Sequence, residues 1–326
     1  MSLPRSILTS KAPSYVLAVG GANMDIIGSA HKQWVMGDSN PGHIRSAPGG
    51  VARNVAENLA RLGHTTHLIS AVGDDAFGRS LLEATHAAGV HTDACAVLAQ
   101  HNTSTYLSLH GYQGDLTVAV NDMDIVNSIT PDFLSAHMPL VSQARAIVAD
   151  CNLNADALSW LITQTRSKVF VDAVSTAKCQ RIRPYLQGMY LLKVNQLEAQ
   201  ALSGLPCSSD VDVQATAQWL HAQGVQQVLI SLGARGMFYS DATDGHGWQN
   251  AMPSDVVNVN GAGDALLAGW MHAMLHDMLL AEAARFAQAC AAMTVGCAAA
   301  NHPGLSIAAA TQLLTDQTTT QQSATP

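Results

Sequence analysis

The chain has 326 residues, of which 48% are hydrophobic and 12% are charged, and its formal net charge at pH 7 is -8. This length supports a large buried core, and the acidic balance without a basic cluster argues against a nucleic-acid polymer as partner. No apolar run reaches the about 18 residues of a membrane span, so no membrane contact is expected. Residues 1–14 lack the apolar segment of a signal peptide.

The six cysteines are scattered, and none has the spacing of a zinc site. Most lie in apolar runs, which favours buried free thiols in a reducing compartment and hence a cytoplasmic location.

Apolar runs and helical patterns alternate from residue 15 onward. Strands are predicted over residues 15–20, 66–72, 145–149, 168–174, 189–194 and 226–232. Helices are predicted over residues 51–62, 75–88, 155–164, 196–203 and 213–223. This alternation predicts an α/β fold with a mostly parallel sheet and helices on both faces. Ligands then bind beyond the carboxyl ends of the strands.

Two segments interrupt the alternation. Residues 30–48 are polar and irregular, whereas residues 103–120 contain two strand-like runs around a glycine turn and predict a β-hairpin. We interpret the segments of about 28–48 and 95–124 as a small β-lid over the site, with an ordinary edge hairpin as the alternative. Residues 15–312, the lid included, are expected to form one domain, with flexible tails at 1–14 and 315–326.

Residues 258–269 read NVNGAGDALLAG, a glycine turn followed by a helix that begins near Asp264. Gly261 and Gly263 let the backbone approach a ligand, and free amides at a helix start favour a phosphate. The helix dipole would keep Asp264 ionised, so its carboxylate could take a proton from an attacking hydroxyl. By itself this pattern fits a catalytic base and a helix cap equally well.

Residues 47–63 contain a second glycine-led helix start. Gly49 and Gly50 leave room for a ligand, and Asn54 offers it a donor and an acceptor; a solvated asparagine at a helix start is the alternative. Asn23 and Asp25 follow the first strand in a loop suited to binding vicinal hydroxyls.

Two more motifs follow strands. Asn195 and Glu198 could position Mg²⁺ through water, or could form a helix capping box. The turn SLGARG at 231–236 could border a nucleotide. GxxxxGK[ST] is absent from the sequence, so the chain is not a P-loop enzyme.

In this order, these motifs resemble the PfkB family of carbohydrate and nucleoside kinases, which has the ribokinase-like three-layer α/β/α fold. The resemblance covers about residues 15–310 and implies transfer of the γ-phosphoryl of ATP to a sugar hydroxyl, with Asp264 as base. The lid of the family closes over the sugar and often pairs subunits, which implies a homodimer. The implied roles are an anion hole at Gly261, Ala262 and Gly263; sugar binding by Asn23, Asp25, Gly49, Gly50 and Asn54; Mg²⁺ and phosphate at Asn195 and Glu198; and ATP at Ser231, Gly233 and Gly236.

One segment departs from the family pattern. Many members have Asp-Thr-Thr before the GAGD run, where this chain has Asn258, Val259 and Asn260. The Asp and Thr often help to bind a monovalent cation, so their loss weakens the expectation of a K⁺ site. The amide of Asn260 could replace a threonine that touches phosphate in ATP.

Long runs such as SNPGHIRSAPGGVARNVAENLA and NQLEAQALSG resemble family members that phosphorylate the 5′-hydroxyl of pseudouridine. The alternatives are a kinase for ribose, uridine or another nucleoside, and a non-catalytic nucleoside-binding regulatory protein on the same fold. Uracil offers two N–H donors and two carbonyls, so a site that recognises it needs both hydrogen-bond donors and acceptors. Candidates, which could equally be cross-strand or turn residues, are Ser104, Thr105, Asn121, Asp122 and Lys178.

Overall fold

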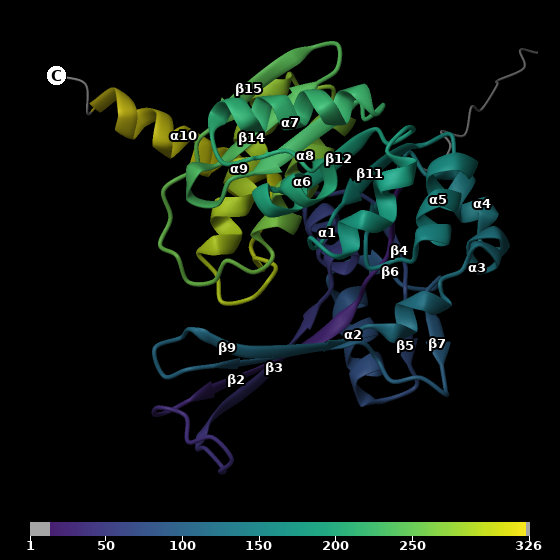
Figure 1. Ribbon diagram of the computed structural model, residues 1–326, viewed down its shortest axis with the longest axis vertical. Helices are drawn as coiled ribbons and strands as arrows, with labels where there is room; N and C mark the ends of the chain where they lie inside the picture. Colours follow the sequence, from purple (N-terminus) through teal and green to yellow (C-terminus); the bar gives the residue numbers. More distant parts are fainter. Residues whose placement is uncertain (1–13, 324–326) are drawn as a thin grey trace, which may run out of the picture.

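The computed structural model describes residues 14–323. Its centre is a nine-stranded sheet with the strand order β15-β14-β13-β12-β11-β10-β1-β4-β6 (Figure 1). The strands from β13 to β6 run parallel, and β14 and β15 are antiparallel. Their bounds are β1 (Val16–Val19), β4 (Thr66–Ile69), β6 (Val90–His91), β10 (Ala146–Asp150), β11 (Lys168–Asp172), β12 (Leu191–Asn195), β13 (Gln227–Ser231), β14 (Met237–Asp241) and β15 (Gly245–Gln249).

Helices cover both faces of this sheet, which confirms the predicted α/β architecture. One face carries α1 (Val51–Arg61), α2 (Ala76–Ala87), α8 (Ala262–Leu275) and α9 (Leu280–Val295). The other carries η1 (Asp124–Ser128), α3 (Pro131–Ala136), α4 (Met138–Gln143), α5 (Ala155–Gln164), η2 (Lys178–Tyr185), α6 (Gln196–Ser203) and α7 (Asp210–Ala222). Helix α10 (Ile307–Ser323) packs against α9, and η3 (Gly233–Arg235) follows β13.

Strand β1 shows why the sheet needs two helical layers. Leu17 and Val19 point into one hydrophobic cluster, and Val16 and Ala18 point into the other. All four are buried, because a parallel strand with helices on both sides has no solvent-facing residues. Such strands appear in the sequence as short continuous apolar runs, which is why they were predictable.

The lid is a four-stranded sheet with the order β3-β2-β8-β9 that projects from the body (Figure 1). It consists of β2 (Asn23–Ala30), β3 (Gly42–Gly49), β8 (Thr105–His110) and β9 (Leu116–Asp122). Strand β9 is exposed along its whole length. The predicted hairpin is therefore present as β8 and β9.

Four details of the predicted organisation are wrong. Residues 42–48 of the segment 30–48 that we expected to be irregular belong to strand β3, which pairs with β2 in antiparallel register. Asn23 and Asp25 lie on β2 instead of in a loop. Residues 95–104 lie outside the lid sheet, because β7 (Ala96–Leu98) pairs with β5 (Ala71–Gly73). The predicted strand 66–72 is divided at Ser70, where the chain leaves the central sheet.

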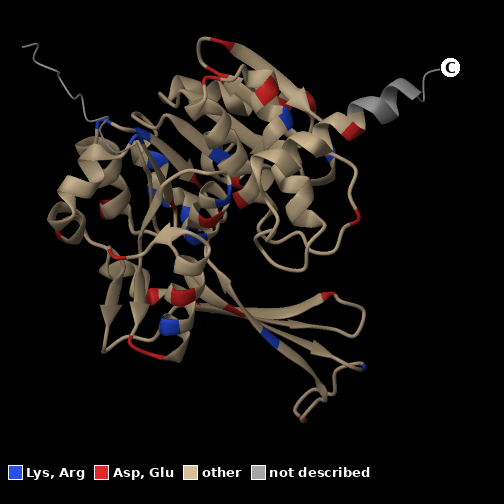
Figure 2. Ribbon diagram, turned by 180° about the vertical axis from the view of Figure 1, so that it is seen from behind, with Lys and Arg blue, Asp and Glu red and all other residues tan. Residues whose placement is uncertain are grey.

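The ends of the chain differ from the prediction in part. Residues 315–323, expected to be a flexible tail, form the last turns of α10. Most of the other predicted tail residues, 1–13 and 324–326, lie outside the described part. Within the described part, no helix is long and apolar enough to cross a bilayer. Basic and acidic residues of the described part occur on many elements (Figure 2).

Candidate active site

The carboxyl ends of four neighbouring parallel strands bring polar residues to one edge of the sheet. Asp150 on β10 pairs in register with Asp172 on β11, and Asp172 pairs with Lys193 on β12. Asn195 at the end of β12 pairs with Ser231 at the end of β13. The N-termini of α1 and α8 meet above this edge, since a hydrogen bond joins their first turns.

Asp264 lies in the first turn of α8. The helix begins after Gly261, whose φ of 78° and whose contact with the Ala300 carbonyl, 1.9 Å from where a Cβ would lie, both require glycine. The side chain of Asp264 is 7% exposed, and its Oδ2 accepts a 2.7 Å hydrogen bond from Asn54 Nδ2. The predicted base and one predicted sugar ligand are therefore direct partners.

Burial changes the expected protonation of Asp264. It raises the pKa of this carboxyl to about 7, with the charge of Asp172 acting in the same direction, while Lys193 and the hydrogen bond from Asn54 oppose the rise. The sequence suggested an ionised carboxylate from the helix dipole alone. It did not reveal that α1 and the strand ends enclose the group.

Lys193 is a candidate site residue that the sequence analysis missed. Its Nζ lies 2.9 Å from Asp172 Oδ2, and a Cβ on Gly263 would lie 2.7 Å from the same Nζ. Burial lowers the pKa of Lys193, but Asp172, Glu198 and Asp264 more than offset this, so the amine remains charged. A buried cation thus lies directly beside the predicted anion hole. The signal in the sequence was a lysine inside the apolar strand LLKVN.

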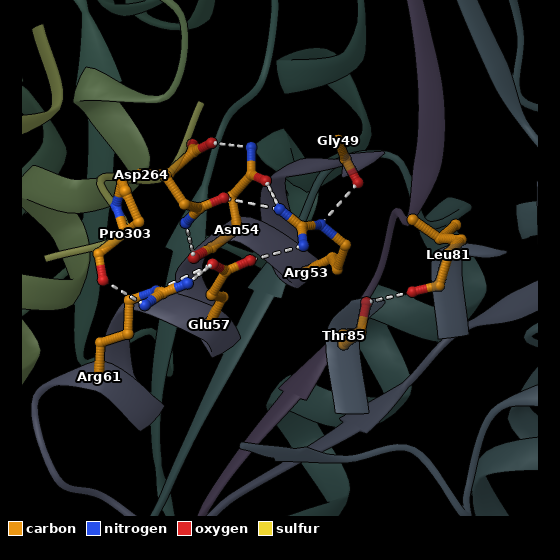
Figure 3. A network of polar contacts seen from close by, with 10 residues as sticks. Gly49, Arg53, Asn54, Glu57, Arg61, Leu81, Thr85, Asp264 and Pro303 are labelled. Carbon is orange, nitrogen blue, oxygen red and sulfur yellow. Dashed lines mark hydrogen bonds and ion pairs between the residues drawn. The ribbon is translucent and has the colours of Figure 1, made fainter. Parts of the chain in front are cut away.

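Arg53 is a second missed residue, and it fixes the amide of Asn54 (Figure 3). Arg53 is 2% exposed, forms a 2.7 Å ion pair with Glu57 and donates to the Gly49 carbonyl. One of its Nη atoms also donates to Asn54 Oδ1 and to Asn301 Oδ1. Because a guanidinium only donates, Asn54 must turn its oxygen toward Arg53 and its NH₂ toward Asp264.

The predicted sugar-binding residues of β2 and β3 lie together. Asn23 pairs in register with Gly49, and Asn23 Nδ2 donates to Asp25 Oδ1 over 2.6 Å. A Cβ on Gly49 would lie 2.4 Å from Asp25 Oδ2, and Gly50 has a φ of 100°. Burial raises the pKa of Asp25, while the hydrogen bond from Asn23 lowers it. The glycines thus let β3 pass closely over the polar pair.

The carboxylate of Asp150 holds the backbone beside this cluster in place. One of its oxygens accepts hydrogen bonds from the amides of Gly21 (3.0 Å) and Ala52 (2.8 Å). The other accepts from the amide of Asn152. The buried carboxylate therefore ties the end of β1 to the first turn of α1, and burial raises its pKa.

Asn195 and Glu198 form the capping box that was one of the two predicted alternatives. Asn195 donates from its amide and from Nδ2 to the two oxygens of Glu198, each over 2.8 Å. Burial raises the pKa of Glu198, and Lys193 opposes the rise. Each oxygen of Glu198 thus already accepts one hydrogen bond, which favours a Mg²⁺ ion held through water.

A cavity of ≈ 530 Å³ lies beside the start of α8. It brings together the predicted nucleotide-binding residues Ser231, Gly233 and Gly236 with Ala262 and Gly263. Its other walls are mostly apolar, as an adenine ring would require; they include Met252, Val256, Leu266, Ala292 and Val295.

Asn260 is not among the residues that line this cavity. Its backbone amide donates to Asn258 Oδ1 over 3.0 Å, and Asn258 Nδ2 donates to the Ala298 carbonyl over 3.1 Å. The turn that replaces Asp-Thr-Thr therefore uses neutral amides where many family members have a carboxylate.

Three of the five base-reading candidates line a polar cavity of ≈ 340 Å³, namely Asn121, Asp122 and Lys178. Lys178 Nζ donates to Asn152 Oδ1 over 2.6 Å. Thr105 is the cross-strand partner of Asp122, as its alternative interpretation proposed. Ser104 precedes β8, and its buried hydroxyl has no hydrogen-bond partner among the described residues.

Comparison with known proteins concerns the family and the fold of the chain. The model of the pfkB family carbohydrate kinases matches residues 13–307. The chain is 44% identical to pseudouridine kinase from Escherichia coli (strain K12) over 295 residues, 90% of this chain and 94% of the relative. It is 38% identical to the uncharacterized sugar kinase YeiI of the same organism over 302 residues, 92% and 83% of the two chains. The ribokinase from Arabidopsis thaliana complexed with ribose and ATP has the same fold, with a TM-score of 0.81 at 22% identity over 93% and 99% of the two chains.

Proposed function

Because the chain belongs to the PfkB family of carbohydrate kinases, we propose that it phosphorylates the 5′-hydroxyl of pseudouridine. The family membership confirms the sequence resemblance and the enzyme class, an ATP-dependent phosphotransferase with an alcohol as acceptor. The observation that carries the proposal is the position of Asp264, buried at the start of α8 between the nucleotide cavity and the cluster around Asn54. The 44% identity to a pseudouridine kinase supports the acceptor.

In the proposed reaction, the ionised Asp264 takes the proton of the 5′-hydroxyl while the hydroxyl oxygen attacks the γ-phosphorus. The bond from oxygen to the γ-phosphorus forms, the bond from phosphorus to the β–γ bridging oxygen breaks, and ADP leaves. The backbone amide of Gly263 and the ammonium of Lys193 would stabilise the charge that builds on the phosphoryl group, and the amide of Ala262 would join them by giving up its 3.4 Å hydrogen bond to the Val259 carbonyl. Asn54, held by Arg53, keeps the carboxylate in place.

Magnesium fits the donor set at this edge of the sheet, which combines the carboxylates of Glu198 and Asp172 with the amide of Asn195. When bound with ATP, the ion would neutralise phosphate charge; Glu198 and Asn195 would hold it through water. Since neutral Asn258 replaces a carboxylate, we expect little dependence on K⁺.

The lid supports a proposed homodimer. Cross-strand pairing places Ile26, Ile44, Leu107, Val118 and Val120 on one face of the lid sheet, opposite the face of Asp25. Ile44 is 81% exposed and Val120 is 62% exposed. A second lid packed on this apolar face would cover it.

The six cysteines form no disulfide, which supports the proposed cytoplasmic location.

A panel of pseudouridine, uridine, ribose and other nucleosides, assayed with ATP for the phosphorylated product by mass spectrometry, tests the proposal. We expect pseudouridine 5′-phosphate as the main product. Strong turnover of uridine or ribose with inert pseudouridine would assign the chain to another member of the family. Calorimetric binding of a nucleoside without any product would indicate a regulatory binding protein, against which the intact Asp264, Lys193 and Glu198 argue.

A further inference from the structure

Three histidines form a cluster far from the proposed active site. His64 follows the C-terminus of α1, His272 lies in the last turn of α8, and His276 caps that helix. His272 is buried, His64 is half-buried and His276 is exposed. One potential ligand nitrogen from each ring lies within 4.8 Å of the others.

The ring nitrogens are already close to the spacing of metal ligands. His64 Nε2 lies 2.9 Å from His272 Nδ1. Two nitrogens that each lie ~2.0–2.1 Å from a tetrahedral zinc ion are roughly 3.3 Å apart. If the two rings moved apart by a few tenths of an ångström, an ion would fit between their nitrogens. The exposed ring of His276 can move toward that ion.

The third ring is oriented by a hydrogen bond of the kind that supports metal ligands. His276 Nδ1 lies 2.8 Å from the carbonyl oxygen of His272. A carbonyl only accepts, so Nδ1 carries the hydrogen and the neutral ring presents the lone pair of Nε2. His272 and His276 are four residues apart, which places both on one face of α8, as in helical zinc motifs. Phe286 stacks on His272 and fixes the plane of that ring.

The chemistry of the three rings selects the class of ion. Imidazole nitrogens suit Zn²⁺, Ni²⁺ and Cu²⁺, whereas Mg²⁺ and Ca²⁺ require oxygen ligands. In its neutral form each imidazole offers one nitrogen lone pair to a metal ion. The guanidinium of Arg145 lies near His64, where it donates to the Leu275 carbonyl, and its positive charge opposes the binding of a cation.

From this geometry we propose that His64, His272 and His276 form a binding site for a single transition-metal ion of the zinc class, with water as the fourth ligand. The site would join the same two helices that carry the proposed catalytic pair. Asn54 and Asp264 join the N-terminal turns of α1 and α8, and the histidines join their C-terminal ends. The two helices pack against each other. A bound ion would therefore stabilise the pairing of α1 with α8.

The test is a zinc titration of tag-free, metal-stripped protein, without nucleotide, in competition with a chromophoric chelator. We expect one Zn²⁺ per chain and a higher unfolding temperature in its presence. Loss of a hydrogen bond that supports a metal ligand lowers metal affinity by about 10–100-fold. Loss of the ligand itself should cost at least as much, so we expect His64→Gln and His276→Gln each to weaken Zn²⁺ binding by this factor or more. Both positions are partly solvent-accessible, so neither variant should prevent folding.

The matched control is His91→Gln, from the stacked pair of His67 and His91, which belongs to no group of three potential metal ligands among the described residues. It should bind Zn²⁺ as the wild type does, and Mg²⁺ should not compete in any variant. Absence of stoichiometric Zn²⁺ binding would overturn the proposal. Unchanged affinity in His276→Gln would also overturn it, because the ion would then be bound elsewhere.

Discussion

Asn54 donates a 2.7 Å hydrogen bond from Nδ2 to Oδ2 of Asp264, across 210 positions of sequence. The contact joins the first turns of α1 and α8, the two helices that open with glycine motifs. Two opposing effects act on the Asp264 carboxyl: burial favours its neutral form, whereas Asn54 and Lys193 favour the carboxylate. The proposed base is consequently balanced near neutral pH, where a general base is most efficient.

Replacing the proposed base by Asp264→Asn should reduce kcat by about 10²–10⁴-fold, since the proton of the hydroxyl then has no acceptor. The chain should still fold, because the amide fills the same volume. Initial rates of ADP formation and far-ultraviolet circular dichroism measure the two effects. Turnover like that of the wild type would rule out Asp264 as the base.

The same variant makes a prediction about stability. The folded-state pKa of Asp264 is raised to about 7 from an ordinary value of 3.8, so the folded chain binds more protons than the unfolded chain between these values. The free energy of unfolding of the wild type should therefore decrease as pH rises from about 4 to 7. At pH 8, Asp264→Asn should be at least as stable as the wild type. A large loss of stability at pH 8 would contradict the proposed origin of the shift.

The pH dependence of catalysis follows from the same group. Only the ionised carboxylate can act as base, so kcat/KM should increase through a pKa near 7 and then level off. In Asn54→Ala, the hydrogen bond that lowers the pKa of Asp264 is absent, and the rising limb should move to higher pH. An unshifted limb in this variant would mean that another group controls the profile.

Much of the fold could be predicted because buried parallel strands and amphipathic helices leave clear patterns. The boundaries of α5 and α6 agree with the prediction to the residue. Strand β3 could not be predicted, since it is exposed along most of its length and its sequence, GHIRSAPG, contains Gly and Pro. β15 was missed for a related reason, since it is a partly exposed edge strand that contains two glycines, whereas β14 is largely buried and its apolar run MFY was overlooked.

The sequence could name candidate site residues where a motif carried them, as for Asp264, Gly49 and Asn195. Lys193 and Arg53 were missed, because a single charge within an apolar strand or a helix has meaning only through its distant partners, Asp172 and Asn301. Such partners come together through tertiary structure, which the spacing of residues along the chain does not encode.

Lys193→Met should remove the charge that faces the phosphoryl group and leave Asp172 without its partner. We expect a large loss of kcat with a smaller change in the KM for pseudouridine, and a destabilisation of about 3–5 kcal/mol. The control is Lys168→Met, an exposed lysine over the ring of Tyr190, which should retain activity. Combining Lys193→Met with Asp172→Asn should recover stability without activity. Recovery of both would assign Lys193 a purely structural role.

The lid makes the last prediction, which concerns assembly. Val118 and Val120 lie on the apolar face of β9, whereas Ala119 between them faces the opposite side. If two lids pack through the apolar face, Val118→Lys with Val120→Lys places charges inside that interface and should give a monomer by light scattering. Ala119→Lys adds a charge to the same strand without entering the interface, so it should remain a dimer. A wild-type monomer, or a dimer that survives the double substitution, would show that this face does not join the subunits.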